Sequence, residues 1–98
     1  MLKGGWVYIL TNKPHGVLYT GVTAHLDERL YQHRQGVGSS FARRYNCDLL
    51  VFAEKHGDIV EAIYREKCIK KWSRLWKLEL IHAQNQTWWD LSTDLHTI

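Results

Sequence analysis

The chain has 98 residues, a hydrophobic fraction of 45% and a formal net charge of +3, which suits one domain with a thin core. No apolar run approaches the roughly 20 residues that span a bilayer, and residues 1–5 do not resemble a signal peptide. We therefore expect a cytoplasmic protein with no membrane partner. Cys47 and Cys68 lack metal-binding or redox spacing, so we expect buried, small apolar residues rather than a disulfide.

Two apolar runs around a short turn predict a β-hairpin near the start of the chain. Residues 6–10 and 17–22 are rich in β-branched and aromatic side chains, which suit a pleated surface. Residues 12–16, between them, contain the proline and glycine of a turn. Tyr8 and Tyr19 can face the same side of this hairpin, although the sequence does not set the register. Two tyrosines on a small sheet more often serve core or rim packing than chemistry.

A helix, a helical turn and a third strand are expected next. Thr23 is positioned to cap the helix, which runs to about residue 35 and ends at a Gly/Ser loop over 36–40. A helical turn over 41–45 then precedes an apolar run of strand length at 48–54.

The second half of the chain is predicted to be helical. Asp58 is placed to begin this stretch, with Glu61 three residues later as in a capping box. The pattern predicts either one helix or two helices with a bend, ending near Ala83. Residues 85–87 break the pattern, and we expect residues 88–91 to fold back on the body.

Positive charge is concentrated in this helical half. Between Arg65 and Glu79, six basic residues accompany two acidic ones, a larger surplus than the net charge of the whole chain. Trp72 and Trp76 are interleaved with these cations, and such mixtures contact phosphates and bases in nucleic-acid-binding proteins. A solvated helix face whose tryptophans dock on the core explains the pattern equally well, so nucleic-acid contact is one of two hypotheses.

Both predicted helical stretches carry charged residues on their apolar stripes. Arg29 and His33 fall on the leucine stripe of the first helix, and Glu66 falls on an apolar stripe of the second. Arginine and glutamate are rarely buried without a partner. Arg29 and Glu66 can form a structural ion pair, or each can reach the rim with its polar end. Alternatively, Arg29, His33 and Glu66 can line a cavity together with the two tyrosines. Such a cavity would contain a base, a phosphate clamp and a hard oxygen ligand.

The order of these elements resembles the GIY-YIG nuclease family, and within it the small single-domain bacterial members (UPF0213-like). Residues 6–8 (WVY) occupy the first signature triplet and residues 19–21 (YTG) the second. The first helix matches the family's arginine and histidine positions with Arg29 and His33, and the second stretch matches its glutamate with Glu66. A tryptophan at the start of the first triplet and a threonine within the second depart from the pattern. These positions are mostly structural in the family, so the departures raise a question about edge packing rather than chemistry.

The resemblance implies an α/β (α+β) domain in which helices flank a three-stranded antiparallel sheet, the GIY-YIG endonuclease fold. It places the nuclease domain at residues 4–83 and a C-terminal closing segment and tail at residues 84–98. It implies a hydrolase that cuts phosphodiester bonds in DNA, an endonuclease that is structure-selective or nonspecific and acts in DNA repair or recombination. Mg²⁺ or Mn²⁺ is the implied cofactor, and DNA and a larger repair complex are the implied partners.

The resemblance also assigns roles to individual residues. The implied catalytic set is Tyr8, Tyr19, Arg29, His33 and Glu66. Tyr8 would be the general base, and because a free tyrosine has a pKa near ~10 it would need positive charge from Arg29 and the metal. Arg29 would also contact the phosphate, and Glu66 would hold the metal, since Mg²⁺ needs only one or two carboxylates. His33 and Tyr19 would orient Tyr8 or the water, or share the base role. The implied DNA-binding residues are Lys67, Lys70, Lys71, Arg74 and Lys77.

Two other functions remain open from the sequence. A non-catalytic nucleic-acid-binding module would keep the fold and the basic helix without cutting DNA. An interaction partner would deliver the nuclease fold to a larger complex. The presence of Tyr8, Tyr19, Arg29 and Glu66 favours the enzyme, because a module that only binds has no need of all four.

Overall fold

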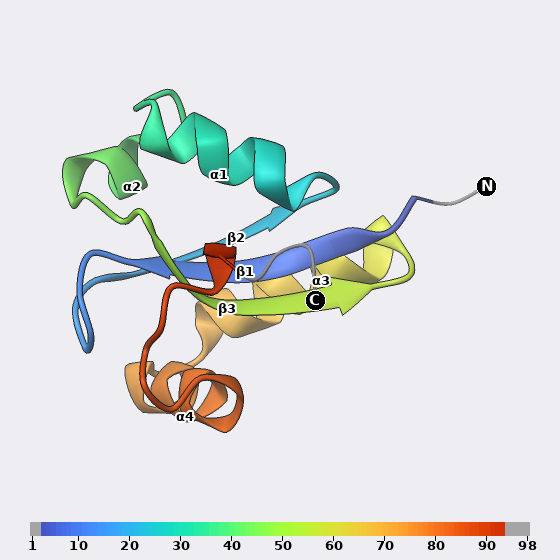
Figure 1. Cartoon of the computed structure of the whole chain (residues 1–98). Helices are drawn as coiled ribbons and strands as arrows, with labels where there is room; N and C mark the ends of the chain where they lie inside the picture. Colours follow the sequence, from blue (N-terminus) through green and yellow to red (C-terminus); the bar gives the residue numbers. More distant parts are fainter. Residues whose placement is uncertain (1–2, 94–98) are drawn as a thin grey trace.

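A three-stranded antiparallel sheet forms the centre of the molecule in a computed structural model that describes residues 3–93. The strands are β1 (Gly5–Thr11), β2 (Leu18–Thr23) and β3 (Leu49–His56), in the order β2-β1-β3 (Figure 1). β1 is the central strand and pairs antiparallel with both neighbours, whereas β2 is an edge strand. The predicted hairpin and third strand are confirmed, and β3 extends two residues beyond the expected end.

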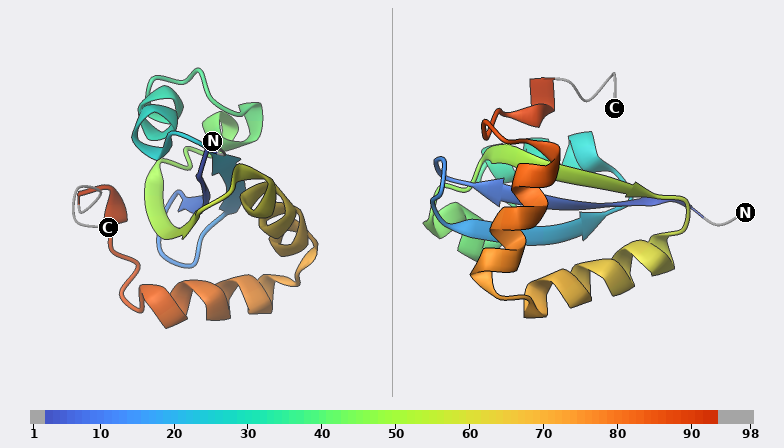
Figure 2. Two further views of the ribbon diagram at one scale, coloured as in Figure 1. Left: turned by 90° about the vertical axis from the view of Figure 1, so that its right-hand side faces the viewer. Right: turned by 90° about the horizontal axis from the view of Figure 1, so that it is seen from below.

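Within residues 3–93, four helices surround the sheet. They are α1 (Leu26–Arg34), α2 (Ser40–Arg44), α3 (Ile59–Lys71) and α4 (Arg74–Gln84). Figure 2 shows α1 and α2 on one side of the sheet and α3 and α4 on the other. α3 lies against β1 and β2, and α4 lies against β3. The expected α+β class, a three-stranded antiparallel sheet flanked by helices, is confirmed.

The central strand supplies side chains to both layers of the core. Tyr8 and Leu10 face α1 and α2, whereas Val7 packs against α3 and Ile9 against α4. This alternation follows from the period of two along a strand. All four side chains have 0% exposure, and burying a large apolar side chain contributes about 1.5–3 kcal/mol. β1 therefore holds the two layers together and sets which residues meet on each face.

The start of α1 differs from the expected cap. Thr23 ends β2, and its hydroxyl accepts a hydrogen bond from the backbone N–H of His25 at 3.0 Å. His25, not Thr23, occupies the N-cap position, and its side chain makes no capping bond. The prediction was wrong because Thr23 lies too early to reach the first helical turn. Asp27 and Glu28 in that turn still complement the positive end of the helix dipole.

The second half of the chain forms two helices with a bend, one of the two predicted arrangements. Asp58 caps α3 as expected and accepts a hydrogen bond from the backbone N–H of Val60 at 2.8 Å. Among residues 3–93, no hydrogen bond to Glu61 completes a capping box. Trp72 leaves α3 with extended backbone, and the Ser73 hydroxyl caps α4 by accepting from a backbone N–H three residues later. The extended residue followed by a new cap is the local cause of the bend.

The segment after α4 folds back on the body, as predicted. The Asn85 side chain donates a hydrogen bond to the backbone oxygen of Val51 in β3 at 3.1 Å. Trp88 is buried in the core between α4 and the sheet. Asp90 accepts a hydrogen bond from a backbone N–H of β3 at 3.2 Å. These contacts cover the β3 side of the sheet; residues 94–98 of the predicted tail lie outside the described residues.

The tryptophan that replaces the first glycine of the signature triplet is accommodated at the end of β1. Trp6 pairs with Thr23 on one side and Lys55 on the other. Its ring is half-buried against the α1-side core, and the Lys55 ammonium lies 5.8 Å from the ring centroid. This cation–π contact and the packing against the core accommodate the bulky Trp6 side chain without disturbing strand pairing.

The two cysteines are free thiols, as expected. The expected burial is confirmed for Cys47 but was wrong for Cys68, which is half-buried on α3. In the part of the chain that the structure describes, every helix is too short or too polar to cross a membrane.

Candidate functional site

The hairpin register brings the two signature segments together on the α1 side of the sheet. Tyr8 is paired with Gly21, and Tyr19 is paired with Leu10. Because cross-strand partners share a face, both tyrosines face α1, as the sequence allowed. A Cβ added to Gly21 would collide with the Tyr8 ring, which is fully buried and cannot move aside. A glycine at this position is therefore required for the tyrosine to pack where it does.

Tyr8, Tyr19 and His33 form a polar cluster between the sheet and α1. The Tyr8 hydroxyl lies 3.1 Å from Nε2 of His33. The Tyr19 ring centroid lies 6.3 Å from that of Tyr8 and 5.4 Å from that of His33. Tyr8 is fully buried, His33 is 8% exposed and Tyr19 is half-buried. Tyr19 is therefore the member of the cluster with the most contact with solvent.

Burial dominates the protonation of this cluster. Desolvation first, and the neighbouring Tyr19 second, raise the pKa of Tyr8 to about 12, and the positive charge of Arg29 offsets only part of this increase. Burial, and to a lesser extent the charge of Arg29, lowers the pKa of His33. At neutral pH the protein alone thus holds Tyr8 as a phenol and His33 as a neutral imidazole. The phenol O–H can donate to an unprotonated Nε2.

The second ring nitrogen of His33 has no hydrogen-bond partner in the described part of the chain. Nδ1 is a buried polar atom without a hydrogen bond among residues 3–93. The backbone of Gly38 covers it so closely that an added Cβ would collide with this nitrogen. An unsatisfied buried polar group costs about 1–3 kcal/mol and is rare in folded proteins. The fold tolerates this cost at the histidine that contacts Tyr8, which is typical of a site kept for chemistry rather than for packing.

Arg29 lies half-buried on α1, one turn before His33. It lines an open pocket of about 130 Å³, which is also lined by Thr23, His25, Glu28 and Gln32. The ion pairs described for residues 3–93 do not include Arg29, so the structural pair between Arg29 and Glu66 is not formed. The guanidinium is therefore positioned at the rim of the cluster, where it can meet an anion.

Glu66 stands apart from the tyrosine–histidine cluster. It is 8% exposed on the inward stripe of α3, and its neighbours on that stripe, Ala62 and Ile69, pack on the face of β1 opposite to Tyr8. Its Oε2 lies 2.9 Å from Nζ of Lys70, one turn further along the helix. Within residues 3–93 no hydrogen bond or ion pair joins this carboxylate to the cluster. Since α3 lies against β2 (Figure 2), the two parts of the predicted site flank the β2 edge of the sheet.

The ligand chemistry of Glu66 fits a hard divalent cation. Mg²⁺ typically binds one or two protein carboxylates and completes its octahedron with waters. In residues 3–93 no group of three or more His, Cys, Asp or Glu side chains is arranged to hold a metal ion. A metal site with Glu66 as its one protein carboxylate is compatible with this donor set. In the present arrangement the ion-pair partner of that carboxylate is Lys70.

Two of the five basic residues expected to bind DNA have partners within the fold. Lys70 is engaged with the α3 carboxylate, and Nη2 of Arg74 donates to two backbone oxygens of the hairpin turn at 2.8 and 2.7 Å. Lys67 and Lys71 are exposed and Lys77 is half-buried. The ion pairs described for residues 3–93 include none of these three. Lys70 is thus the weakest candidate for a phosphate contact, because its charge is already paired with a carboxylate. Lys67, Lys71 and Lys77 remain candidates, and so does Arg74, because the backbone oxygens that it contacts do not neutralise its charge.

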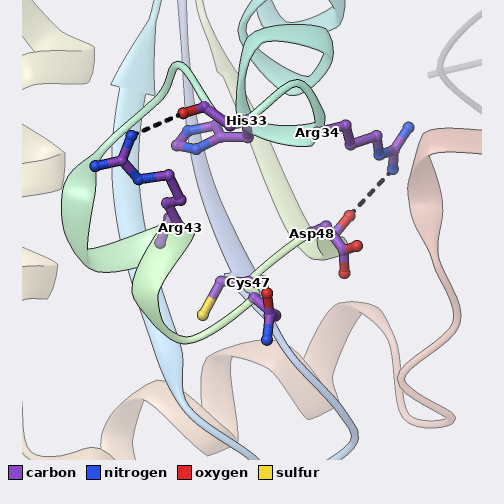
Figure 3. A pocket seen from close by; sticks show the side chains of 8 residues that line it. His33, Arg34, Arg43, Cys47 and Asp48 are labelled. Carbon is purple, nitrogen blue, oxygen red and sulfur yellow. Dashed lines mark hydrogen bonds between the residues drawn. The ribbon is translucent and has the colours of Figure 1, made fainter.

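A second pocket, of about 130 Å³, lies on the α2 side of His33 (Figure 3). Its two arginines already serve the fold, as the dashed lines show. Arg34 donates to the backbone oxygen of Asp48, and Arg43 donates to a backbone oxygen of the loop after α1, both at 3.2 Å. Burial first, and the charge of Asp48 second, raise the pKa of the Cys47 thiol, so this cysteine is not an activated nucleophile. The pocket therefore adds no reactive group to the site.

The family model described as "GIY-YIG catalytic domain" matches residues 4–79. The chain belongs to the GIY-YIG family. The matched region contains both signature triplets, the arginine and histidine of α1, and the glutamate of α3. The family that the motifs predicted is therefore confirmed over most of the chain.

Curated relatives named UPF0213 proteins share most of their length with this chain. A UPF0213 protein of Clostridium perfringens is 39% identical over 80 residues, which cover 82% of this chain and 85% of the relative. A UPF0213 protein of Staphylococcus haemolyticus is 36% identical over 79 residues, which cover 81% and 95%. One of Photorhabdus laumondii is 33% identical over 84 residues, which cover 86% and 81%. No solved structure gives a significant match.

Sequence reasoning missed three residues that shape the GIY-YIG site. Gly21 was placed in the second triplet, but only the strand register shows that Tyr8 needs it. Gly38 was assigned to a loop, and nothing in the sequence indicates that its backbone covers His33. Phe41 was assigned to a helical turn, yet its ring stacks beside Tyr19 with centroids 6.2 Å apart. Only the glycine of the second triplet was indicated by the sequence. The contacts of Gly38 and Phe41 depend on how the loop after α1 returns to the sheet.

Proposed function

We propose that this GIY-YIG protein is a divalent-metal-dependent DNA endonuclease, structure-selective or nonspecific, that acts in DNA repair or recombination in the cytoplasm. The observation that supports this most is the buried hydrogen bond between Tyr8 and His33 beside Arg29. Burying polar groups costs free energy, and sheet packing alone would be served as well by apolar side chains. A module that only binds nucleic acid has no use for this cluster.

The proposed scissile phosphate binds at the β2 edge, where α1 and α3 approach the sheet from its two faces. Arg29 contacts the non-bridging oxygens, because a planar, permanently charged guanidinium matches them. Glu66 is the residue that holds Mg²⁺ or Mn²⁺. When bound, the cation supplies charge stabilisation to the phosphate and the leaving oxygen. This arrangement explains why the glutamate stands apart from the tyrosines: the substrate, not a protein contact, joins the two parts.

The proton of the attacking water passes to the tyrosine–histidine cluster. With a pKa raised to about 12, Tyr8 is not a phenolate at neutral pH and cannot act alone. It can accept the proton of water as its own proton moves to Nε2 of the neutral His33, which lies within hydrogen-bonding distance. Tyr8 has no exposed surface, so the less buried Tyr19 places the water and must shift for the water to reach Tyr8. The general base in this proposal is the Tyr8–His33 pair.

The alternative is a nucleic-acid-binding module that has the GIY-YIG fold but does not cut. Two observations favour it. Tyr8 is sealed from solvent, and Glu66 is engaged with Lys70 rather than with the cluster. In this alternative the polar cluster is a structural feature and the basic residues of α3 and α4 provide the binding.

A cleavage assay separates the two. End-labelled single-stranded, duplex, flap and branched DNA are incubated with the protein in Mg²⁺, in Mn²⁺ and in EDTA. If the protein is the proposed endonuclease, it should make internal cuts that require the cation and that are absent with the Glu66→Gln variant. A folded protein that binds these DNAs but cuts none of them in either metal would favour the module. Equal cutting by the parent and by Glu66→Gln would show a contaminating nuclease or a different metal site.

A further inference from the structure

An open groove of about 290 Å³ lies beside the proposed site. It is lined by Val17, Leu18, Phe41, Arg74 and Lys77. These residues come from the end of the hairpin turn and the start of β2, from α2 and from the first turns of α4. Figure 1 shows that the hairpin turn, α2 and α4 lie toward the same end of the sheet. The groove therefore combines an apolar, aromatic wall with two cations, and its lining contains no acidic side chain.

The aromatic wall is continuous with the buried cluster. Phe41 is 44% exposed, and its ring centroid lies 4.8 Å from that of Tyr45. On its other side Phe41 stacks beside Tyr19 at 6.2 Å with an interplanar angle of 27°. Tyr19 in turn contacts His33 at 5.4 Å. A row of rings thus leads from an exposed phenylalanine to the hydroxyl groups of the proposed reaction centre.

The opposite wall is positively charged. Arg74 is held in place by its two hydrogen bonds to the hairpin turn, and Lys77 follows three residues later on the same helix face. The first turn of α4 has no acidic residue, and the ion pairs described for residues 3–93 include neither cation. Within residues 3–93 no ion pair therefore neutralises their charges, which attract an anion to this wall.

We propose that this groove binds an unpaired nucleotide of the DNA, with its base on Phe41 and its phosphate against Arg74 and Lys77. The inference rests on the proposed function and names its substrate class: DNA with a single-stranded segment next to the cut. Stacking on an aromatic side chain needs a free base face, which the stacked base pairs inside a duplex do not offer. Cations alone would attract any DNA. The ring of Phe41 is therefore what distinguishes unpaired from paired DNA, and an apolar protein segment would leave the two cations without a partner.

The test measures binding without cleavage, in EDTA. Fluorescence anisotropy compares the parent and Phe41→Ala on a labelled single strand, a blunt duplex and the same duplex with a single-stranded overhang. The parent should prefer the two DNAs that contain a single strand. Phe41→Ala should weaken binding to those two roughly 5- to 150-fold, the range expected for one base stacked on an aromatic ring, and leave the blunt duplex unchanged. A 2-aminopurine in the overhang should be quenched by the parent and not by the variant.

Matched variants separate stacking from loss of apolar surface and from loss of fold. Tyr31→Ala removes an aromatic ring that is 65% exposed on α1 and does not line the groove, so binding should not change. Phe41→Leu keeps the apolar bulk without a ring and should behave like Phe41→Ala, whereas Phe41→Trp keeps an aromatic ring and should bind like the parent. Melting curves verify that each variant is folded. Lys77→Gln should weaken binding to all three DNAs.

The proposal is overturned if Phe41→Ala and Tyr31→Ala have equal effects, or if Phe41→Ala weakens the blunt duplex as much as the single strand. It is also overturned if the parent does not bind single strands, which would leave the groove to a protein partner. Its failure is separable from that of the nuclease. Cutting without any effect of Phe41 would remove only the groove, whereas Phe41-dependent binding by a protein that cuts no DNA would remove only the nuclease.

Discussion

Tyr8→Phe removes one hydroxyl from the centre of the proposed site and leaves the ring in place. That hydroxyl lies 3.1 Å from Nε2 of His33, whose Nδ1 already lacks a partner in the described part of the chain. The variant therefore buries an imidazole with neither nitrogen paired, at a cost of about 1–3 kcal/mol in the free energy of unfolding. Each kcal/mol lowers the melting temperature of a domain of this size by about 4–8 °C. We expect a folded but measurably less stable protein.

Cleavage should fall much further than stability. Loss of a general base typically reduces the rate constant about 10²–10⁴-fold. The assay is single-turnover cutting of labelled DNA in Mg²⁺, well below the melting temperature of the variant and over a range of pH. The parent's rate should rise with pH, because neutral His33 is needed to receive the proton, and this rising limb should be absent in Tyr8→Phe.

Tyr31→Phe is the matched control, because it removes a hydroxyl from a side chain that is 65% exposed on α1. Its stability and cleavage should equal those of the parent. Tyr19→Phe tests the division of roles within the cluster. A folded Tyr8→Phe that cuts at the parent's rate would refute the proton transfer, and a larger loss in Tyr19→Phe than in Tyr8→Phe would assign the base role to Tyr19.

Four further predictions follow from the same geometry. Glu66→Gln should abolish metal-dependent cutting but preserve DNA binding in EDTA; a parental rate would make Glu66 structural. Arg29→Ala should slow cleavage about 10²–10³-fold and keep the rise of the rate with pH. It should barely change the melting temperature, because Arg29 takes part in none of the ion pairs described for residues 3–93. A large drop in melting temperature would contradict this. The pKa of His33 is lowered from 6.5 on folding, so the unfolded chain binds the proton more readily and stability should decline as the pH falls below this value. Urea unfolding at several pH values should show this slope in the parent and a flatter one in His33→Gln. Replacing Lys67 and Lys71 with Gln should reduce the slope of log affinity against log salt by about 0.9 for each lysine that contacts a phosphate; an unchanged slope would make them a solvated face.

The sequence by itself determined the elements, their order and the family. The hairpin, the third strand and the cap at Asp58 follow from local patterns: alternation, turn residues and a capping side chain near its own backbone. The two triplets and the charged residues on the helical stripes depend on spacing along the chain, so they were also accessible. The start of α1 shows the limit of such reasoning. The N-cap residue is His25 rather than the predicted Thr23, because a shift of two residues puts the Thr23 side chain out of reach of the first helical turn.

Only the tertiary structure decided which of these residues meet. The register between β1 and β2 places Gly21 under Tyr8, and the return of the loop after α1 places Gly38 against His33. The pKa of Tyr8 reflects its burial and the neighbouring Tyr19, which together outweigh the interactions with Arg29. Glu66 pairs with Lys70 on its own helix rather than with Arg29, because α3 packs on the other face of the sheet. Contacts between segments far apart in the chain depend on packing, so no local pattern could have specified them.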